Sequence, residues 1–237
     1  MKEFDLALVM PVYNEKDCIA GVVQSWDEVL TSLNIRYQIL VYNDGSKDNT
    51  LQVLQGFNNS LTIKVIDKPN AGHGPTILLG YKQAVPLAAW VFQCDSDGEM
   101  MPGSFPALWA KRDEYDALFG YRENRVQSQS RAFISAASRF AVKTFFGAGI
   151  RDVNTPYRLI RAAILADMVE TIPSNTFAPN VLISGELCRR KCRIFNAPVP
   201  HLQRRTGQSS VVGWKLWKAV IKSFFQTIRY TLERRGR

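Results

Sequence analysis

Three acidic residues follow the most apolar stretch of this 237-residue sequence, in the run Asp95-Ser96-Asp97-Gly98-Glu99. Carboxylates two residues apart, directly after a buried strand, suit a hard divalent cation such as Mg²⁺ or Mn²⁺. Such an ion takes further ligands from substrate phosphates and offsets the charge of a departing diphosphate. A solvated acidic turn is the alternative, because a bare pair of aspartates at this spacing is common. We expect Asp95, Asp97 and Glu99 to form a metal site if this loop lies at a ligand-binding edge.

Two further polar loops carry groups that could bind a nucleotide. Pro11-Val12-Tyr13-Asn14-Glu15 ends one apolar run, and Asn43-Asp44-Gly45-Ser46 ends another. The Asp44 carboxylate could accept hydrogen bonds from a base or a ribose, and Gly45 would allow a close backbone approach. A strand-end turn and a helix N-cap explain the same residues without a ligand. The occurrence of three such loops favours ligand binding.

Alternating strands and helices position these loops. Apolar runs predict strands over 6–12, 37–42, 61–66 and 89–94. Helical spacing predicts helices over 16–33, 48–57 and 73–85. This order is typical of a parallel sheet with helices on both faces, which binds ligands at the carboxyl ends of its strands.

The second half of the sequence is less regular. We expect strands over 116–121, 155–160 and 193–199, and helices over 127–146, 179–190 and 211–234. The last helix has Trp and Phe on one arc and Lys and Arg on another, which is typical of a helix that lies in a bilayer interface. Packing of its apolar arc on the domain or on a second subunit is the alternative.

Composition narrows the class of protein. Apolar residues make up 46% of the chain, which excludes a disordered or fibrous protein. Thirty Lys and Arg against 21 Asp and Glu give a net charge of +9, which favours an anionic partner such as nucleic acid, a phospholipid surface or a phosphorylated substrate. The cysteines are not spaced as a zinc site and are expected to be reduced, buried thiols: Cys18, Cys94, Cys188 and Cys192.

In order along the chain, the runs PVYNE, NDGSKDNT, NAGHGPTILLGY and DSDGE resemble the motifs of family 2 glycosyltransferases. The resemblance covers roughly the first 125 residues. It implies an inverting enzyme of the α/β GT-A fold, a Rossmann-like mixed sheet with helices on both faces. It also implies that the first two loops hold the nucleotide of a UDP- or GDP-sugar donor and that Mg²⁺ or Mn²⁺ bridges the acidic loop to the diphosphate. The donor-binding residues implied are Pro11, Tyr13, Glu15, Asp44, Gly45 and Asp95.

Later motifs resemble the polyprenol-phosphate sugar transferases, the group that includes dolichol-phosphate mannose synthase. Gly120-Tyr121-Arg122 resembles a strand end of that group, and Asp152 through Tyr157-Arg158 resembles its D-x-x-x-G-F-R run. Three departures are Thr155-Pro156 before the aromatic-arginine pair, His73 in place of Lys or Leu, and Ser210 in place of Lys. The arginines that could bind phosphate oxygens as forked donors are Arg122, Arg131, Arg158, Arg204 and Arg205.

The acceptor decides whether catalysis needs a base. A phosphate acceptor is already anionic, so positioning and charge neutralisation suffice. A hydroxyl acceptor would need a carboxylate base, for which Asp152 is the candidate, although it could simply pair with Arg158. Surface ion pairs are the alternative for the arginines, of which we expect at least three to face the pocket. The catalytic set is therefore predicted as Asp97, Asp152, Arg122, Arg131, Arg158 and Arg204.

The leading prediction is metal-dependent transfer of a sugar from a nucleotide donor to a polyprenyl phosphate at a membrane surface. A saccharide hydroxyl is the alternative acceptor; a nucleic-acid-binding protein and an inactive nucleotide-sugar binder are less favoured. No secretory signal is evident at the N-terminus, so we expect a peripheral enzyme on the cytoplasmic face. Either its last helix suffices as the anchor or a partner membrane protein anchors it, and a homo-oligomer is a further expected assembly. The expected division is a catalytic domain over 1–210, with a nucleotide-sugar half (1–125) and an acceptor half (126–210), and a basic amphipathic helix over 211–237.

Overall fold

The computed structural model describes residues 2–123 and 149–202. Several predictions fall outside these residues: Arg131, Arg204, Arg205, the helix over 127–146 and the amphipathic segment 211–237. Within the described part of the chain, no helix combines the length and the apolar character needed to cross a membrane.

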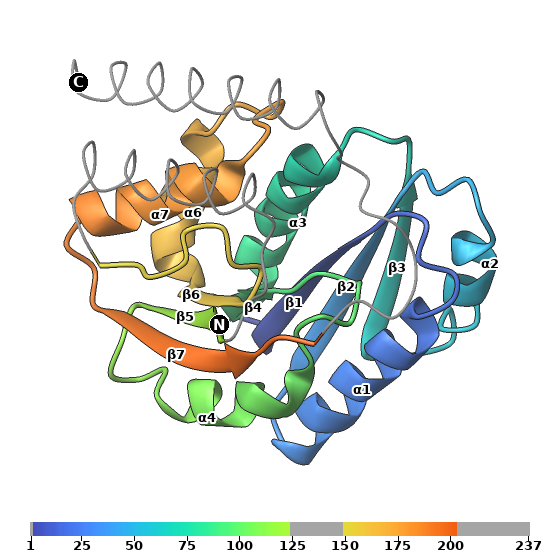
Figure 1. Ribbon diagram of the computed structural model, residues 1–237, viewed down its shortest axis with the longest axis horizontal. Helices are drawn as coiled ribbons and strands as arrows, with labels where there is room; N and C mark the ends of the chain where they lie inside the picture. Colours follow the sequence, from blue (N-terminus) through green and yellow to red (C-terminus); the bar gives the residue numbers. More distant parts are fainter. Residues whose placement is uncertain (1, 124–148, 203–237) are drawn as a thin grey trace.

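One seven-stranded sheet runs through the described residues (Figure 1). Its strands are β1 (Phe4–Val12), β2 (Tyr37–Asp44), β3 (Ile63–Lys68), β4 (Ala88–Gln93), β5 (Ala117–Glu123), β6 (Arg158–Arg161) and β7 (Ile194–Pro200). Their spatial order is β3-β2-β1-β4-β6-β5-β7. The first four strands are parallel, β6 is antiparallel to both β4 and β5, and β7 is parallel to β5. The predicted mixed sheet is therefore confirmed.

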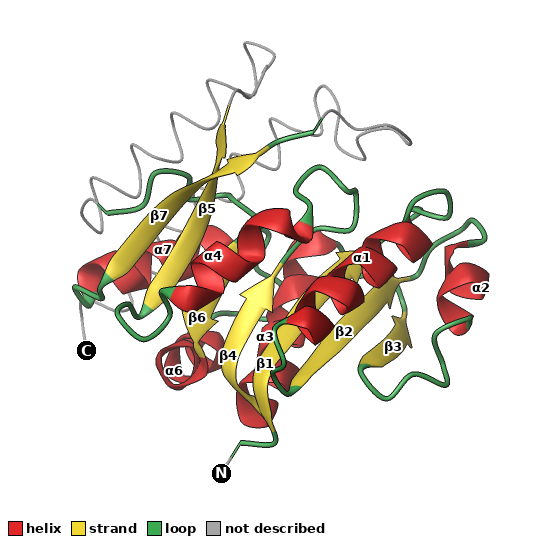
Figure 2. Cartoon of the chain, turned by 90° about the horizontal axis from the view of Figure 1, so that it is seen from below, coloured by secondary structure: helices red, strands yellow, loops and turns green. Residues whose placement is uncertain are grey.

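Helices cover both faces of this sheet (Figure 2). One face carries α1 (Ile19–Ser32), α2 (Thr50–Gln55), the short 3₁₀ turn η1 (Pro102–Ser104) and α4 (Phe105–Ala110). The other face carries α3 (His73–Leu87), α6 (Ala162–Thr171) and α7 (Pro179–Arg189). The two layers leave the ends of the strands as the places where polar loops can gather.

Strand β1 has apolar side chains on both of its faces. Leu6, Leu8 and Met10 belong to the core under α1, whereas Ala7 and Val9 belong to the core under α3. Because successive side chains of a strand point to opposite faces, a strand buried on both faces has to be apolar throughout. This is the reason for the unbroken apolar run in the sequence.

An aromatic cluster joins the two halves of the chain. The Tyr157 ring lies 4.8 Å from the Phe92 ring and 5.9 Å from the Trp26 ring, measured between centroids. Phe105 packs against the same two rings at 4.8 and 5.6 Å. The segment that leads into β6 is thus packed against the core of the first four strands.

The sequence placed most elements but missed two helices and the start of one strand. The predicted strand over 155–160 begins only at Arg158, because the carbonyls of Val153 and Thr155 accept hydrogen bonds from the Arg158 side chain. Helix α4 has only six residues, and α6 follows β6 directly. Helix α4 is too short to be recognised in a sequence, and α6 lacks the polar capping residue that marks a helix start.

Gly80 lies where α3 packs most closely on the sheet. A Cβ atom at this position would meet Val9 Cγ1 at 2.3 Å and the Tyr42 ring at 3.1 Å. We expect Gly80→Ala to lower the free energy of unfolding by about 1–3 kcal/mol, because stiff, buried neighbours would have to move. Gly21→Ala on α1 is the matched control, since a Cβ there meets nothing within 4 Å. Urea unfolding would measure both, and equal stability of the two variants would contradict this packing.

Candidate active site

The loops after β1 and β2 are hydrogen bonded to each other at the carboxyl edge of the sheet. Asn14, which has a positive φ of 56°, accepts a 2.8 Å hydrogen bond from the Lys47 backbone N–H. The Asn14 N–H in turn donates to Ser46 Oγ at 3.0 Å. These contacts confirm the prediction that the polar loops meet at one edge.

Glu15 and Cys18 tie the same edge to the acidic loop after β4. The Glu15 N–H donates to Thr50 Oγ1 at 2.8 Å, and its carboxylate accepts from Cys18 Sγ at 3.3 Å. Cys18 Sγ also lies 3.6 Å from the Ser96 carbonyl oxygen. Glu15 is 8% exposed, so its carboxylate is held largely inside the edge, while Tyr13 is half-buried and Pro11 is buried within β1.

Asp44 holds the loop between β3 and α3. Its buried carboxylate accepts hydrogen bonds from Lys68 Nζ, from the Ala71 N–H at 2.8 Å and from the Gly72 N–H at 2.9 Å. Burial raises the pKa of this carboxyl, but the hydrogen bonds from Lys68 and Ala71 outweigh burial and hold the pKa below its ordinary value. We expected the Asp44 carboxylate to accept hydrogen bonds from a base or a ribose. In the structure, groups of the protein donate most of these hydrogen bonds.

Gly45 is needed for the same loop contact. It has a φ of +63°, and a Cβ atom there would lie 2.7 Å from the Asn70 backbone nitrogen. The close approach that the sequence suggested is therefore an approach to Asn70. Asp44 and Gly45 together fix the start of α3 beside the acidic loop.

The acidic loop presents Asp95 and Asp97, both partly exposed. Asp95 Oδ1 accepts a 3.1 Å hydrogen bond from Gln93 Nε2, and His73 Nε2 lies 3.6 Å from the same oxygen. Asp97 Oδ1 accepts from the Glu99 N–H at 3.0 Å across Gly98, which has a φ of +70°. The loop is thus built so that each aspartate uses one oxygen to hold its own conformation.

Glu99 was predicted as a third metal ligand, and the structure gives its carboxylate a protein partner. Glu99 Oε2 lies 2.9 Å from His201 Nε2, and the Leu202 N–H donates to the Glu99 carbonyl oxygen at 2.8 Å. Among the described residues, no group of three or more His, Cys, Asp or Glu is arranged to hold a metal. Sequence reasoning missed His201, whose only signal was its place just after the last predicted strand.

Arg122, near the end of β5, and Asp152, in the segment before β6, lie next to each other. Arg122 Nε lies 3.6 Å from Asp152 Oδ2, and Arg122 Nη2 donates to the Asn154 carbonyl oxygen at 3.3 Å. Their side chains are 11% and 21% exposed. Asp152 also accepts from the Asn154 N–H at 3.2 Å. Asp152 therefore pairs with Arg122 and not with Arg158, the partner that the alternative interpretation gave it.

The prediction that Arg158 binds phosphate is wrong. Its side chain is completely buried, and its guanidinium donates to the carbonyl oxygens of Thr155, Val153 and Asn180 at 2.8–3.2 Å, with Ser184 Oγ at 3.5 Å. A guanidinium has five N–H donors, and these contacts occupy them. Burial lowers the pKa of Arg158, and Tyr81, Asp152 and Asp95 oppose that shift. Arg158 holds the 153–155 turn and α7 together.

Burial raises the pKa of three of the cysteine thiols, those of Cys94, Cys188 and Cys192. All four are free thiols, as predicted, although only Cys94 is fully buried. Burial raises the pKa of the Cys94 thiol well above its ordinary value, and the charges of Asp95 and Asp97 raise it further. A thiol with a raised pKa stays protonated and is a poor nucleophile or ligand.

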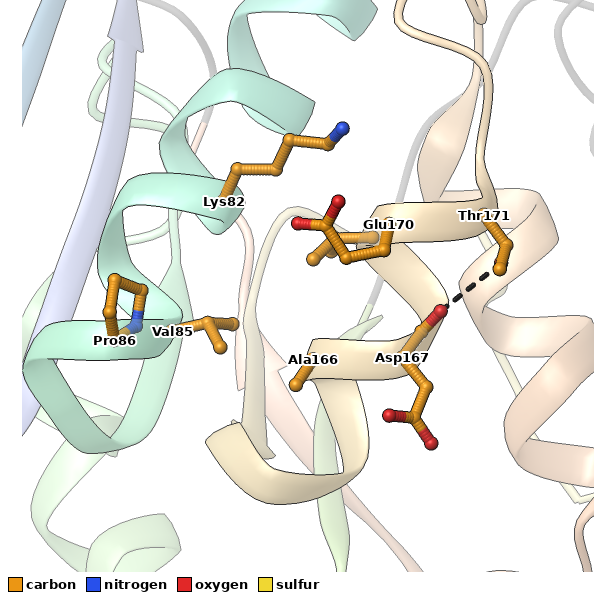
Figure 3. Close-up of a pocket in the computed structure, with 8 residues that line it drawn as sticks. Lys82, Val85, Pro86, Ala166, Asp167, Glu170 and Thr171 are labelled. Carbon is orange, nitrogen blue, oxygen red and sulfur yellow. Dashed lines mark hydrogen bonds between the residues drawn. The ribbon is translucent and has the colours of Figure 1, made fainter.

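A groove of about 550 Å³ lies between α3 and α6, away from these loops (Figure 3). Its walls include Lys82 and Pro86 near the end of α3 and Glu170 on α6. Because α3 begins at the carboxyl edge of the sheet, the end of this helix lies toward the opposite edge. The groove is therefore separate from the acidic loop.

A family model described as "Glycosyl transferase family 2" matches residues 7–167. The chain belongs to this family. The matched range contains the three polar loops of the carboxyl edge, together with Arg122, Asp152 and Arg158. The family 2 domain has the mixed α/β architecture expected of the GT-A fold.

Solved structures support the fold of this glycosyltransferase. Glucosyl-3-phosphoglycerate synthase from Mycobacterium tuberculosis, in complex with Mn²⁺ and UDP-glucose, aligns with a TM-score of 0.68 at 14% identity, over 96% of this chain and 79% of that one. TarS 1-349 from S. aureus, in complex with UDP-GlcNAc, aligns with a TM-score of 0.62 at 21% identity, over 94% of this chain and 66% of that one. In another TarS structure the match spans 58% of that chain. At these identities the similarity shows the fold alone.

The Asp44 contacts predict a pH-dependent loss of stability. We expect Asp44→Asn to lower the free energy of unfolding by about 1–3 kcal/mol at pH 7, because an amide cannot accept all three hydrogen bonds. The folded pKa lies below the unfolded value, so this contribution is complete above about pH 4 and is lost as the pH falls through the folded pKa. The stability difference between the two proteins should therefore shrink in acid.

Chemical denaturation between pH 3 and pH 7 would measure this difference. Asp113→Asn is the control, because the Asp113 side chain is 77% exposed and its removal should matter little at any pH. A difference for Asp44→Asn that persists unchanged at pH 3 would contradict the assignment of Asp44 as the ionised anchor of this loop.

Proposed function

We propose that this chain transfers a sugar, with inversion, from a nucleoside diphosphate donor to a polyprenyl phosphate. The observation that carries the proposal is the meeting of the Asp95–Asp97 loop with the loops after β1 and β2 at the carboxyl edge of a family 2 domain. Open α/β sheets bind nucleotides at this edge. A UDP-sugar donor is supported by the two relatives whose structures contain UDP-glucose and UDP-GlcNAc.

We propose that Mn²⁺ or Mg²⁺ is held by Asp95 and Asp97. The residues fit such an ion, because both are partly exposed carboxylates and these ions are commonly held by one or two carboxylates plus substrate phosphates. When bound, the ion would neutralise charge on the leaving diphosphate. Glu99 is the weaker candidate ligand, since its carboxylate already contacts His201. The relative crystallised with Mn²⁺ supports this cofactor.

The chain's own groups orient the reactants around that loop. Asp44 and Gly45 set the position of the segment that leads into α3, so that the donor's nucleotide meets a preformed edge. Arg122 supplies a largely buried guanidinium beside Asp152, suited to an anionic acceptor. Arg131 and Arg204 remain proposed phosphate contacts on the strength of their motifs.

The acceptor in this proposal is a lipid phosphate. It rests on the later motifs and on the net charge of +9. The same considerations lead us to propose a peripheral position on the cytoplasmic face of a membrane, with residues 211–237 as the contact and a membrane protein or second copy as a further anchor. A phosphorylated acceptor has a parallel in the relative crystallised with phosphoglyceric acid.

A transfer assay tests the reaction. A panel of labelled UDP- and GDP-sugars is offered with Mn²⁺ or Mg²⁺ to a short polyprenyl phosphate. We expect a lipid-linked product that chelation abolishes and that Asp97→Asn reduces at least about 100-fold, because the amide keeps the hydrogen bond to the Glu99 N–H but loses the charge. Asp113→Asn should leave the rate unchanged. Transfer that persists in Asp97→Asn or with chelator would overturn the metal assignment.

Asp152 distinguishes the two acceptor classes. A saccharide hydroxyl has to lose a proton, so Asp152→Asn should then lower kcat by about 100- to 10,000-fold and flatten the pH profile. A phosphate acceptor needs no base, and the same variant should mainly raise KM through its contact with Arg122. Donor turnover onto a saccharide, with none onto the lipid phosphate, would replace the proposed acceptor by the hydroxyl.

A further inference from the structure

A chain of buried polar side chains ends on Asp95. Tyr81 on α3 donates its hydroxyl proton to Asn180 Oδ1 at 3.1 Å, and Asn180 Nδ2 on α7 donates to Gln93 Oε1 at 3.0 Å. Gln93, the last residue of β4, then donates from Nε2 to Asp95 Oδ1 at 3.1 Å. The exposed fractions of Tyr81, Asn180 and Gln93 are 1%, 9% and 0%. Side chains from α3, α7 and β4 therefore form a hydrogen-bonded chain that ends on one carboxylate oxygen.

The ionised Asp95 sets the direction of every bond in this chain. A carboxylate can only accept, so Gln93 has to turn its NH₂ group toward Asp95 and its carbonyl oxygen inward. That oxygen accepts from the NH₂ group of Asn180 and lies 3.5 Å from the Tyr81 hydroxyl, and Asn180 Oδ1 accepts from the same hydroxyl. If either amide group were reversed, two donors or two acceptors would face each other in the chain.

Gln93 is costly at a position that packing alone would fill with an apolar residue. It lies in a strand with buried apolar residues on both sides in sequence, Phe92 and Cys94, and a buried amide destabilises a fold unless both of its ends are hydrogen bonded. Here the Asp95 carboxylate accepts the hydrogen bond from the NH₂ end of the Gln93 amide. Asn180 is fixed as well, because its carbonyl oxygen accepts from Arg158 Nη1 at 3.2 Å. The chain is thus anchored at its inner side by the same guanidinium that holds α7.

We propose that Gln93 is a positioning residue for Asp95, held in turn by Asn180 and Tyr81. The amide fixes Oδ1 of Asp95, which directs the other carboxylate oxygen to the cation at the donor diphosphate. The inference rests on the proposed function, because it concerns the carboxylate that would bind Mn²⁺. Partners that hold a metal-binding side chain in this way commonly change metal affinity 10- to 100-fold when they are replaced.

The experiment measures Mn²⁺ binding to the whole chain in the presence of UDP, by titration calorimetry and by the electron paramagnetic resonance of free Mn²⁺. Gln93→Met keeps the length of the side chain and removes its donor, so we expect a dissociation constant about 10-fold higher or more. Gln93→Glu keeps the acceptor for Asn180 but sets a carboxyl against Asp95, and it should weaken binding at least as much. Tyr81→Phe should give a smaller increase, since it leaves the hydrogen bond from Gln93 to Asp95 in place.

Tyr42→Phe is the matched control. Tyr42 is also fully buried, and its hydroxyl donates to the amide of another α3 residue, Gln83 Oε1, at 2.8 Å. Both tyrosine variants remove one hydroxyl hydrogen bond to an amide oxygen, and thermal unfolding would report their loss of stability. A weaker affinity for Mn²⁺ in Tyr81→Phe but not in Tyr42→Phe supports positioning. Equal affinities in the two, with Gln93→Met also unchanged, overturn it.

The same titrations separate this inference from the proposed function. If the unchanged chain binds Mn²⁺ and Asp97→Asn does not, the metal site stands, and an unchanged affinity in Gln93→Met overturns the positioning role alone. If the unchanged chain with UDP binds no Mn²⁺, both the metal-dependent reaction and the positioning role are overturned.

Discussion

Strand β1 is covered by helices on both faces, so polar groups for a site have to come from beyond the strand ends. The parallel strands β1, β2 and β4 end at the same edge, and their loops meet there through contacts such as Lys47 to Asn14 and Cys18 to Ser96. Because the faces of the sheet are buried, the polar groups of the site gather at this edge. The acidic loop contributes three partly exposed carboxylates to this edge, those of Asp95, Asp97 and Glu99.

A different constraint governs the short irregular segment before β6. Its backbone carbonyl groups need hydrogen-bond donors. Residues 153–155 form a turn before β6, and the Arg158 guanidinium donates to the carbonyl oxygens of Val153 and Thr155 and of Asn180 on α7. A buried cation with five donors can organise such a turn only when every donor is used. Arg158, which its motif suggested as a phosphate ligand, therefore has a structural role inside the fold.

The sequence predicted the placement of the polar loops where that placement depends on the local order of residues. The order of apolar runs and polar loops was sufficient for the first four strands, and Asp95 and Asp97 follow β4 as expected. It failed where the partner lies far along the chain. Glu99 and His201 are 102 residues apart, and Gln93 and Asn180 are 87 apart, so no spacing rule connects them. Arg158 failed for a related reason, because its motif shows the residue type but not its burial.

These long-range contacts give the two halves a shared function. Asn180 uses its carbonyl oxygen to bind Arg158 and its side chain to hold Gln93, so one residue of α7 touches both the turn of the acceptor half and the support of Asp95. Transfer requires the leaving diphosphate and the attacking acceptor to be aligned, and small displacements of either cost rate. A rigid connection through largely buried hydrogen bonds is a physical means of keeping that alignment.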